Sequence, residues 1–301
     1  MTSPCAVCGS ESLAPHLTVA RSSDGNLAAT TTDYGAAPGD IVRCAACGHM
    51  QVRELPAEDL LEEEYAQVWE EAYVAEEAGQ RATARRALER IERHVPGSGG
   101  AGRALCDLGC WVGFLLSEAD RRGWRVTGVE PSHYGAAYAR QRLSLDVQEA
   151  TIATASLPRE SFDAVVMGDV IEHLPNPGAA LRRAAELLRP GGVLYLTLPD
   201  AGSTVARVLG ARWWSVLPTH VHYFTGQSLA RLLGRSGFAV EWAGSAPKAF
   251  SVGYYLGRLE GYAPAVAGGA VAAARAMGLA DRLVWPDFRD RMAVLARLRG
   301  A

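Results

Sequence analysis

The stretch ALCDLGCWVGFLLSEADRRG (104–123) decides the fold of this chain. It begins with a short apolar run typical of a buried strand, passes through a turn at Gly109–Gly113, and ends in an amphipathic helical pattern. The next segment, RVTGVE (125–130), predicts a second strand that ends in Glu130. In a parallel α/β sheet, ligands lie at the carboxyl ends of the strands, where an acidic residue can accept both hydroxyls of a ribose. The turn lacks the G-x-G-x-x-G pattern, so by itself it is weak evidence for a nucleotide site.

Further strands follow along the chain. A third strand is expected around Asp146–Thr151, and SFDAVVMGDV (161–170) and GGVLYLTLP (191–199) predict a fourth and a fifth. A helical pattern precedes nearly every strand, which is the arrangement that builds a parallel sheet through right-handed crossovers. Helices are expected within 251–287, followed by a last strand near Met292–Leu298.

Two cysteine pairs precede this region. Cys5 and Cys8, and then Cys44 and Cys47, each enclose two residues and are followed by glycine. Such knuckles can point four thiolates at one metal, and four sulfur ligands suit zinc with no position left open for water. The alternatives are two disulfides or four cysteines without a role, and a reducing compartment disfavours the disulfides. We therefore expect a structural zinc site, with His16 and His49 as surface residues.

The residues between the second cysteine pair and the first strand of the sheet predict a helical connection between two domains. Segment 54–94 is rich in strong helix formers, and PGSGGAG (96–102) reads as a linker. This predicts a zinc ribbon over 1–53, a helical bridge or lid over 54–100 and an α/β domain over 101–301. Tyr65, Trp69 and Tyr73 recur at helical spacing and are interpreted mainly as packing residues, with Tyr65 and Tyr73 as candidate lid residues over a substrate.

Composition excludes some classes of function. The chain has 49% hydrophobic and 21% charged residues and a formal net charge of -3, which is typical of a globular protein and argues against a phosphate-gripping surface. The opening MTSPCAVCGS has neither a basic nor an apolar leader segment. The most apolar stretch, Tyr262–Ala274, is too short to span a bilayer. We expect a cytoplasmic protein that binds neither membrane nor nucleic acid.

Five motifs, which follow one another along the chain, resemble those of a known family. They are DLGCWVGFLL, GVEPS, FDAVVMGDVIEHLPNP, LLRPGGVLYLTLP and HVHYFTGQSLARLLGRSGF, and they cover about residues 100–250. Together they resemble the class I S-adenosylmethionine-dependent methyltransferases, and the four-cysteine ribbon resembles enzymes that methylate nucleotide-linked deoxysugars in antibiotic pathways. The resemblance implies a Rossmann-like, mostly parallel seven-stranded sheet whose last strand pairs antiparallel at the sheet edge.

The resemblance also implies where S-adenosylmethionine binds. Asp107, Gly109 and Gly113 would pass under its methionine part, together with Cys110 and Trp111 of the same loop. Trp111 replaces the middle glycine of the family pattern, and we expect its side chain to point away from the cofactor. The remaining contacts would be Glu130 on the ribose, Thr151 and Ile152 beside the adenine, and Met167, Gly168 and Asp169 at the sulfonium.

Methylation of a hydroxyl or of a carbon acid also needs a base. Histidine is the natural base at neutral pH, which makes His173, His220 and His222 the catalytic candidates. In the sugar methyltransferases that this segment resembles, the histidine matching His220 serves as the base, although a glutamate precedes it there and Thr219 precedes it here. His173 could equally fix its own loop. Trp213, Trp214 and Tyr223 could form an acceptor wall or pack in the core. No histidine–carboxylate cluster for a catalytic metal is visible in the sequence.

These patterns favour a small-molecule methyltransferase acting on a hydroxyl of a sugar or other natural-product intermediate. Carbon methylation of a nucleotide-linked keto-deoxysugar is the close alternative. A ribosomal RNA base methyltransferase and a non-catalytic scaffold are weaker alternatives, the first because of the net acidity and the second because the cofactor motif is retained. The helical insert at 251–287 could cap the acceptor pocket or form a homodimer face.

Overall fold

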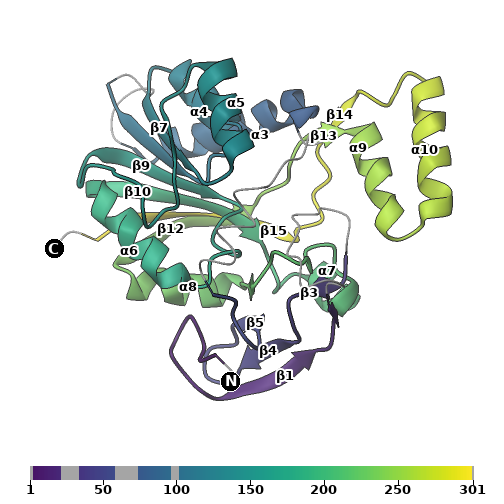
Figure 1. Ribbon diagram of the computed structural model, residues 1–301, viewed down its shortest axis with the longest axis horizontal. Helices are drawn as coiled ribbons and strands as arrows, with labels where there is room; N and C mark the ends of the chain where they lie inside the picture. Colours follow the sequence, from purple (N-terminus) through teal and green to yellow (C-terminus); the bar gives the residue numbers. More distant parts are fainter. Residues whose placement is uncertain (1–2, 22–33, 58–73, 96–101, 300–301) are drawn as a thin grey trace.

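A computed structural model describes residues 3–21, 34–57, 74–95 and 102–299 of the chain (Figure 1). Its centre is a seven-stranded sheet with the strand order β12-β15-β10-β9-β6-β7-β8. The strands β10, β9, β6, β7 and β8 run parallel, and β15 runs antiparallel to both of its neighbours. The Rossmann-like, mostly parallel seven-stranded sheet is therefore confirmed. The strand bounds are β6 (Ala104–Leu108), β7 (Arg125–Glu130), β8 (Val147–Glu149), β9 (Phe162–Gly168), β10 (Leu188–Pro199), β12 (Phe238–Ser245) and β15 (Arg291–Leu298).

The last strand does not lie at the sheet edge, so that expectation was wrong. β15 is inserted between β10 and β12, and β12 forms the edge. The sequences show the physical reason: Met292–Ala296 is a continuous buried run, as in a strand covered on both faces. In β12 only Phe238 is buried and the other residues are half-buried or exposed, which suits a strand at the edge of the sheet.

Helices cover both faces of the sheet and build two cores. Apolar residues of α3, α4 and α5 pack on one face, and those of α6 and α8 pack on the other. Figure 1 shows the same two layers, with α9 and α10 lying to one side of the sheet. The helix bounds are α3 (Glu77–Glu92), α4 (Phe114–Asp120), α5 (His133–Leu143), α6 (Pro177–Leu187), α7 (Thr204–Leu209), α8 (Gly226–Arg235), α9 (Val252–Gly257) and α10 (Pro264–Ala276).

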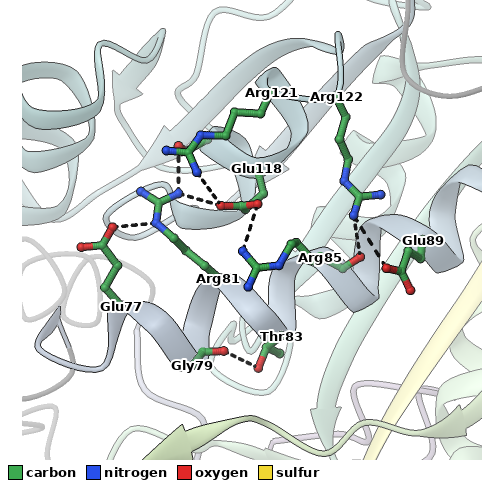
Figure 2. Close-up of polar contacts among 10 residues, drawn as sticks. Glu77, Gly79, Arg81, Thr83, Arg85, Glu89, Glu118, Arg121 and Arg122 are labelled. Carbon is green, nitrogen blue, oxygen red and sulfur yellow. Dashed lines mark hydrogen bonds and ion pairs between the residues drawn. The ribbon is translucent and has the colours of Figure 1, made fainter. Parts of the chain in front are cut away.

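A cluster of charges around the buried carboxylate of Glu118 joins α3 to α4. The carboxylate of Glu118 on α4 accepts hydrogen bonds from Arg81 (3.0 Å), Arg85 (3.3 Å) and Arg121 (3.1 Å), as Figure 2 shows. Arg81 also donates to Ser117 (3.0 Å) and lies over a phenyl ring, 5.0 Å from its centroid. The helical bridge predicted from the sequence is thus joined to the first helix of the α/β unit by ion pairs as well as by apolar packing.

The cysteine-containing region forms a second, small sheet. Strands β1 (Leu13–Leu17), β4 (Ile41–Cys44) and β5 (Met50–Val52) pair antiparallel, and β11 (His222–Tyr223) adds a fourth strand beside β5. Two short pairs, β2 (Ala20–Arg21) with β3 (Ala36–Ala37) and β13 (Phe250–Ser251) with β14 (Leu283–Val284), complete the strands. Two 3-10 turns, η1 (Gly210–Arg212) and η2 (Arg258–Gly261), follow α7 and α9.

Among the described residues, no helix is both long enough and apolar enough to cross a bilayer.

Candidate active site

A cavity of about 970 Å³ opens at the carboxyl ends of β6, β7 and β9. Its wall includes Gly109 after β6, Glu130 at the end of β7, and Gly168 at the end of β9. The far wall comes from the loop after β9, from residues 214–220 and from the insert that contains α9 and η2. Parallel sheets bind their ligands at this end, and the volume is at the upper end of the range for small-molecule sites.

The turn after β6 is shaped for close approach to a ligand. Gly109 has a φ of +82°, and a Cβ there would come within 2.5 Å of Val170 Cγ2. Only glycine satisfies both conditions without strain. The turn therefore lies directly against the loop that follows β9, and both loops line the cavity.

Glu130 is the buried acid at the end of β7. Its Oε2 accepts a hydrogen bond from the backbone N–H of Trp111 (2.7 Å), and its Oε1 accepts one from that of Ser132 (2.8 Å). Burial raises the pKa of Glu130 to about 7, although these two N–H groups oppose the rise. Each carboxylate oxygen has two acceptor sites, so one per oxygen remains for a ligand that brings its own hydroxyl donors.

Trp111 adopts the backbone conformation that a glycine would adopt freely. Its φ of +50° lies in the left-handed region, which costs a non-glycine residue about 1–2 kcal/mol. The hydrogen bond to Glu130 holds this conformation. The indole packs towards Tyr134, with 5.9 Å between ring centroids, and a Cβ on Gly135 would lie 3.1 Å from the indole Cε3. Trp111 also lines the cavity, and its buried Nε1 has no hydrogen-bond partner within the described chain.

The other cofactor candidates divide into two groups. Thr151, Ile152, Gly168 and Asp169 line the cavity together with Gly109, Trp111 and Glu130. A second group lies in the layer beneath: Asp107 and Cys110 are buried, Met167 is fully buried in the core, and Gly113 begins α4. Burial and the nearby Glu130 raise the pKa of Asp107 to about 7.

Asp169 lines the cavity and carries two ion pairs. It contacts Lys248 (Nζ–Oδ2 2.5 Å) and Arg291, and these cations hold the pKa of its carboxyl well below the usual range against the effect of burial. Lys248 is the only lysine of the chain and lines the same cavity. Nothing in the local sequence around Lys248 indicated this position.

The structure brings together a histidine–carboxylate cluster that was not visible in the sequence. Glu172, His173 and His220 place ligand-type atoms within 4.8 Å of one another, and all three line the cavity. Burial and the nearby Asp169 raise the pKa of Glu172 to about 8, and both of its carboxylate oxygens lack a hydrogen-bond partner in the described chain. A cluster of this kind can exchange protons with an acceptor or hold a divalent cation.

Both histidines of this cluster are oriented by the backbone. His173 Nδ1 donates to Thr219 O (2.9 Å) and His220 Nδ1 donates to Ser215 O (2.8 Å). The rings meet edge to face with centroids 4.6 Å apart. Burial lowers the pKa of His173 to about 4 and that of His220 well below its usual range. A carbonyl can only accept, so each neutral ring carries its proton on Nδ1 and keeps the Nε2 lone pair.

The remaining acceptor candidates lie in different places. Trp214 lines the cavity, and its indole N–H donates to Asp290 (2.6 Å). Trp213 and Tyr223 are buried in a core that the ribbon shares, and His222 is turned towards His49 of the ribbon. Tyr65, Trp69 and Tyr73 lie outside the described residues.

The aromatic side of the cavity was only partly visible in the sequence. Tyr34 from the ribbon and Tyr254, Tyr255 and Tyr262 from the insert line it. Tyr34 stacks on Tyr262 with ring centroids 5.0 Å apart, and Arg258 lies over Tyr34 at 5.3 Å. Tyr254 and Tyr255 belong to the insert that the sequence offered as a possible cap, whereas Tyr262 and Tyr34 were not recognised as lining residues.

The four cysteines of the ribbon come together. The sulfurs of Cys5 and Cys47 are 3.5 Å apart, those of Cys8 and Cys44 are 3.6 Å apart, and all four lie within 4.8 Å of one another. Zinc–sulfur bonds of about 2.3 Å in a tetrahedron require sulfur–sulfur edges of about 3.8 Å. The cluster is therefore close to the size that one zinc ion requires.

His49 is not a surface residue, so that expectation was wrong. It is fully buried, and its Nε2 lies 3.2 Å from His222 Nδ1. It also packs on Phe224, with ring centroids 4.7 Å apart. The reason is the pairing of β5 with β11, which covers the second knuckle with a strand from much later in the chain. His16 on β1 is exposed, as expected.

Comparison with known proteins assigns the family. Residues 78–242 match the family described as a methyltransferase domain. The ubiquinone biosynthesis O-methyltransferase of Rhodopseudomonas palustris (strain BisA53) is 35% identical over 155 residues, which cover 46% of this chain and 60% of that protein. The protein of the same description from Aeromonas salmonicida (strain A449) is 31% identical over 165 residues, covering 50% and 69%. The chain thus spans about 60% of the length of the first of these relatives.

Solved structures agree on the fold. A Thermotoga maritima S-adenosylmethionine-dependent methyltransferase, described as a possible histamine N-methyltransferase, superposes with a TM-score of 0.50 at 19% identity over 76% of this chain and 94% of that one. A Burkholderia thailandensis N1-methyltransferase of 1,6-didemethyltoxoflavin superposes with a TM-score of 0.50 at 16% identity over 83% and 96%. At these identities the likeness concerns the fold alone. From the match that covers residues 78–242, the chain belongs to the methyltransferase domain family.

Proposed function

We propose that this protein transfers the methyl group of S-adenosylmethionine to a hydroxyl oxygen of a small-molecule acceptor. One observation carries the proposal: a single cavity joins the buried carboxylate of Glu130 to the neutral pair His173 and His220. The first feature suits the ribose of the cofactor, and the second suits removal of a hydroxyl proton. The O-methyltransferase relatives support oxygen as the atom that is methylated.

The cofactor would occupy the Glu130 end of the cavity. Glu130 would accept the ribose hydroxyls, and Thr151 and Ile152 would flank the adenine. The turn after β6 would pass under the methionine part, with Trp111 as a wall and Asp107, Cys110 and Gly113 shaping the loop from beneath. Met167, Gly168 and Asp169 would close the sulfonium end. The bound cofactor would supply an activated methyl group, so the protein need not prepare the leaving group.

The base is assigned to the histidine pair. His220 and His173 each present an Nε2 lone pair, because Nδ1 is bound to a backbone carbonyl. A hydroxyl placed against either Nε2 would pass its proton there as the oxygen attacks the methyl carbon. Such a base contributes roughly 10²–10⁴-fold to the rate. Glu172, which is neutral below about pH 8, adjoins both rings and would hold the acceptor by hydrogen bonds.

The acceptor is proposed to be a ring-shaped molecule, such as a sugar or another natural-product intermediate. Support comes from aromatic residues in the wall of the cavity, among them Trp214, Tyr254 and Tyr262. Faces of aromatic rings stack on the apolar faces of such molecules. We further propose that the four-cysteine ribbon over 1–53 binds structural zinc and that the methyl-transfer chemistry belongs to 101–301.

A panel assay tests this function. The protein is incubated with S-adenosylmethionine and hydroxyl-bearing sugars, nucleotide sugars and phenols, and the products are identified by mass spectrometry. We expect the mass gain of one methyl group with retention of deuterium on the neighbouring acceptor carbon. Loss of that deuterium would mean carbon methylation and would overturn the assignment of oxygen. Undiminished turnover in both His173→Ala and His220→Ala would overturn the assigned base.

A further inference from the structure

We propose that the metal-binding ribbon holds the acceptor wall of the cavity in place, and that His49 is the positioning residue that links the two. The inference rests on the proposed function, in which His220 and Glu172 contact the acceptor. It gives the ribbon a role in positioning the acceptor site that goes beyond structural zinc binding.

The ribbon sheet contains a strand of the acceptor segment. In β11, His222 pairs with Gln51 and Tyr223 pairs with Met50 of β5. The backbone N–H of Val52 also donates to Val221 O (3.0 Å). The residues that follow His220 are therefore fixed in register by the strand that leaves the second cysteine knuckle.

The ribbon and the acceptor segment also share one apolar core. Met50 and Val52 of β5 pack in the same buried cluster as Val216, Val221 and Tyr223. Tyr223 then reaches back, because its hydroxyl donates to His220 O (3.1 Å). The backbone on both sides of His220 is thus packed against the ribbon.

His49 connects the metal knuckle to this segment. It lies two residues after Cys47, and its carbonyl accepts a hydrogen bond from the N–H of Cys44 (2.8 Å), which closes the knuckle. Its ring nitrogen lies 3.2 Å from that of His222, one donating to the other in a fully buried setting. A shift of the knuckle therefore moves His222 directly.

The same segment is bound to the backbone of Glu172, the acidic residue of the cluster. The N–H groups of Val221 and His222 both donate to Glu172 O (3.0 Å each). The path from the cysteine knuckle through His49 and His222 thus ends at two residues of the acceptor cluster, Glu172 and His220. The cofactor end is instead held by Glu130 and the turns after β6 and β7, whose described contacts lie within the α/β unit. Disturbing the ribbon should accordingly affect the acceptor end and spare the cofactor end.

The test compares His49→Ala with His16→Ala, an exposed histidine of the same ribbon. Three readouts are taken: zinc content, S-adenosylhomocysteine affinity by calorimetry, and the ring resonances of His173 and His220 in protein with ¹⁵N-labelled histidine. We expect His49→Ala to keep its zinc and to hold its affinity within about twofold, while the His220 resonances shift. Methyl transfer should fall at least about tenfold in kcat, since a displacement near 1 Å can cost more than that. His16→Ala should match the wild type in every readout.

Two further measurements guard against a folding defect. His49→Gln keeps a side-chain hydrogen bond to His222 and should restore part of the His220 signal and of kcat. Chelating zinc from the wild type should shift the same His220 resonances while affinity for S-adenosylhomocysteine persists. Unchanged His220 resonances in both His49→Ala and the zinc-stripped protein would overturn the inference. A loss of affinity for S-adenosylhomocysteine in His49→Ala as large as its loss of kcat would also overturn it. The resonance test needs no turnover, so it decides the inference even if no acceptor is methylated.

Discussion

Replacing Glu130 with glutamine should weaken the binding of the cofactor. The wild-type carboxylate accepts backbone N–H groups from Trp111 and Ser132, one on each oxygen. A glutamine offers one acceptor oxygen, so its amide NH₂ must face one of these N–H groups or turn away. One charge-assisted hydrogen bond of about 1.5–3 kcal/mol is therefore lost within the turn. The left-handed backbone of Trp111 loses its support at the same time.

The effect on binding follows from the same geometry. An ionised carboxylate can take two ribose hydroxyls, whereas a neutral amide takes one and holds it less strongly. A loss of about 1.4–2.7 kcal/mol corresponds to a roughly 10- to 100-fold weaker affinity for S-adenosylhomocysteine. The assay is a calorimetric titration at pH 8, above the pKa of about 7 that burial gives Glu130, so that the wild type is mostly ionised.

The matched control is Glu149→Gln. Glu149 pairs with Glu130 in the sheet register but ends β8, and it is ion-paired with Arg140 (2.7 Å) instead of with backbone donors. Its replacement should leave affinity within about twofold of wild type. If Glu130→Gln is folded, by circular dichroism and thermal unfolding, and binds as tightly as the control, the assignment of Glu130 to the ribose is refuted.

Three more outcomes follow from the described contacts. Since ribose hydroxyls favour the ionised form of Glu130, affinity for S-adenosylhomocysteine should rise with pH up to about 7 and level off above it, and equal affinities at pH 6 and pH 8 would contradict this. Arg81→Ala removes buried hydrogen bonds to Glu118 and Ser117 and should lower the free energy of unfolding by about 1–3 kcal/mol. A denaturant titration measures this, and Arg85→Ala, at a half-exposed residue, should lower it by less than half as much. Elemental analysis should find about one zinc per chain, and Cys8→Ser should lose it and lower the thermal midpoint, so a wild type without zinc would refute the ribbon assignment.

Local patterns predicted the elements of the fold well. The apolar runs of β6, β9 and β10 and the glycine turn after β6 arise from short-range sequence, because burial and backbone conformation act within a few residues. The place of β15 between β10 and β12 could not be predicted in this way. Sheet order depends on which strands meet after the whole chain has folded, and a run such as Met292–Ala296 only indicates that its strand is covered on both faces.

In the candidate site too, local patterns predicted some residues, whereas others depend on contacts between distant segments. Gly109 and Glu130 belong to one continuous strand–turn–helix–strand segment, so the local sequence indicated that they lie at the same end of the sheet. Glu172 was overlooked because a lone glutamate beside His173 resembles any charged loop residue, and its meaning comes from burial and from His220 about fifty residues later. The contact between His49 and His222 joins two segments that no local pattern connects.

The most direct test of the account is a crystal structure of the protein with S-adenosylhomocysteine. We expect the ribose hydroxyls on Glu130, the homocysteine part against Gly109, and the sulfur facing the open volume beside His173 and His220. A nucleoside bound away from Glu130, or a sulfur pointing out of the cavity with the histidines on the opposite side, would contradict the proposed methyl transfer.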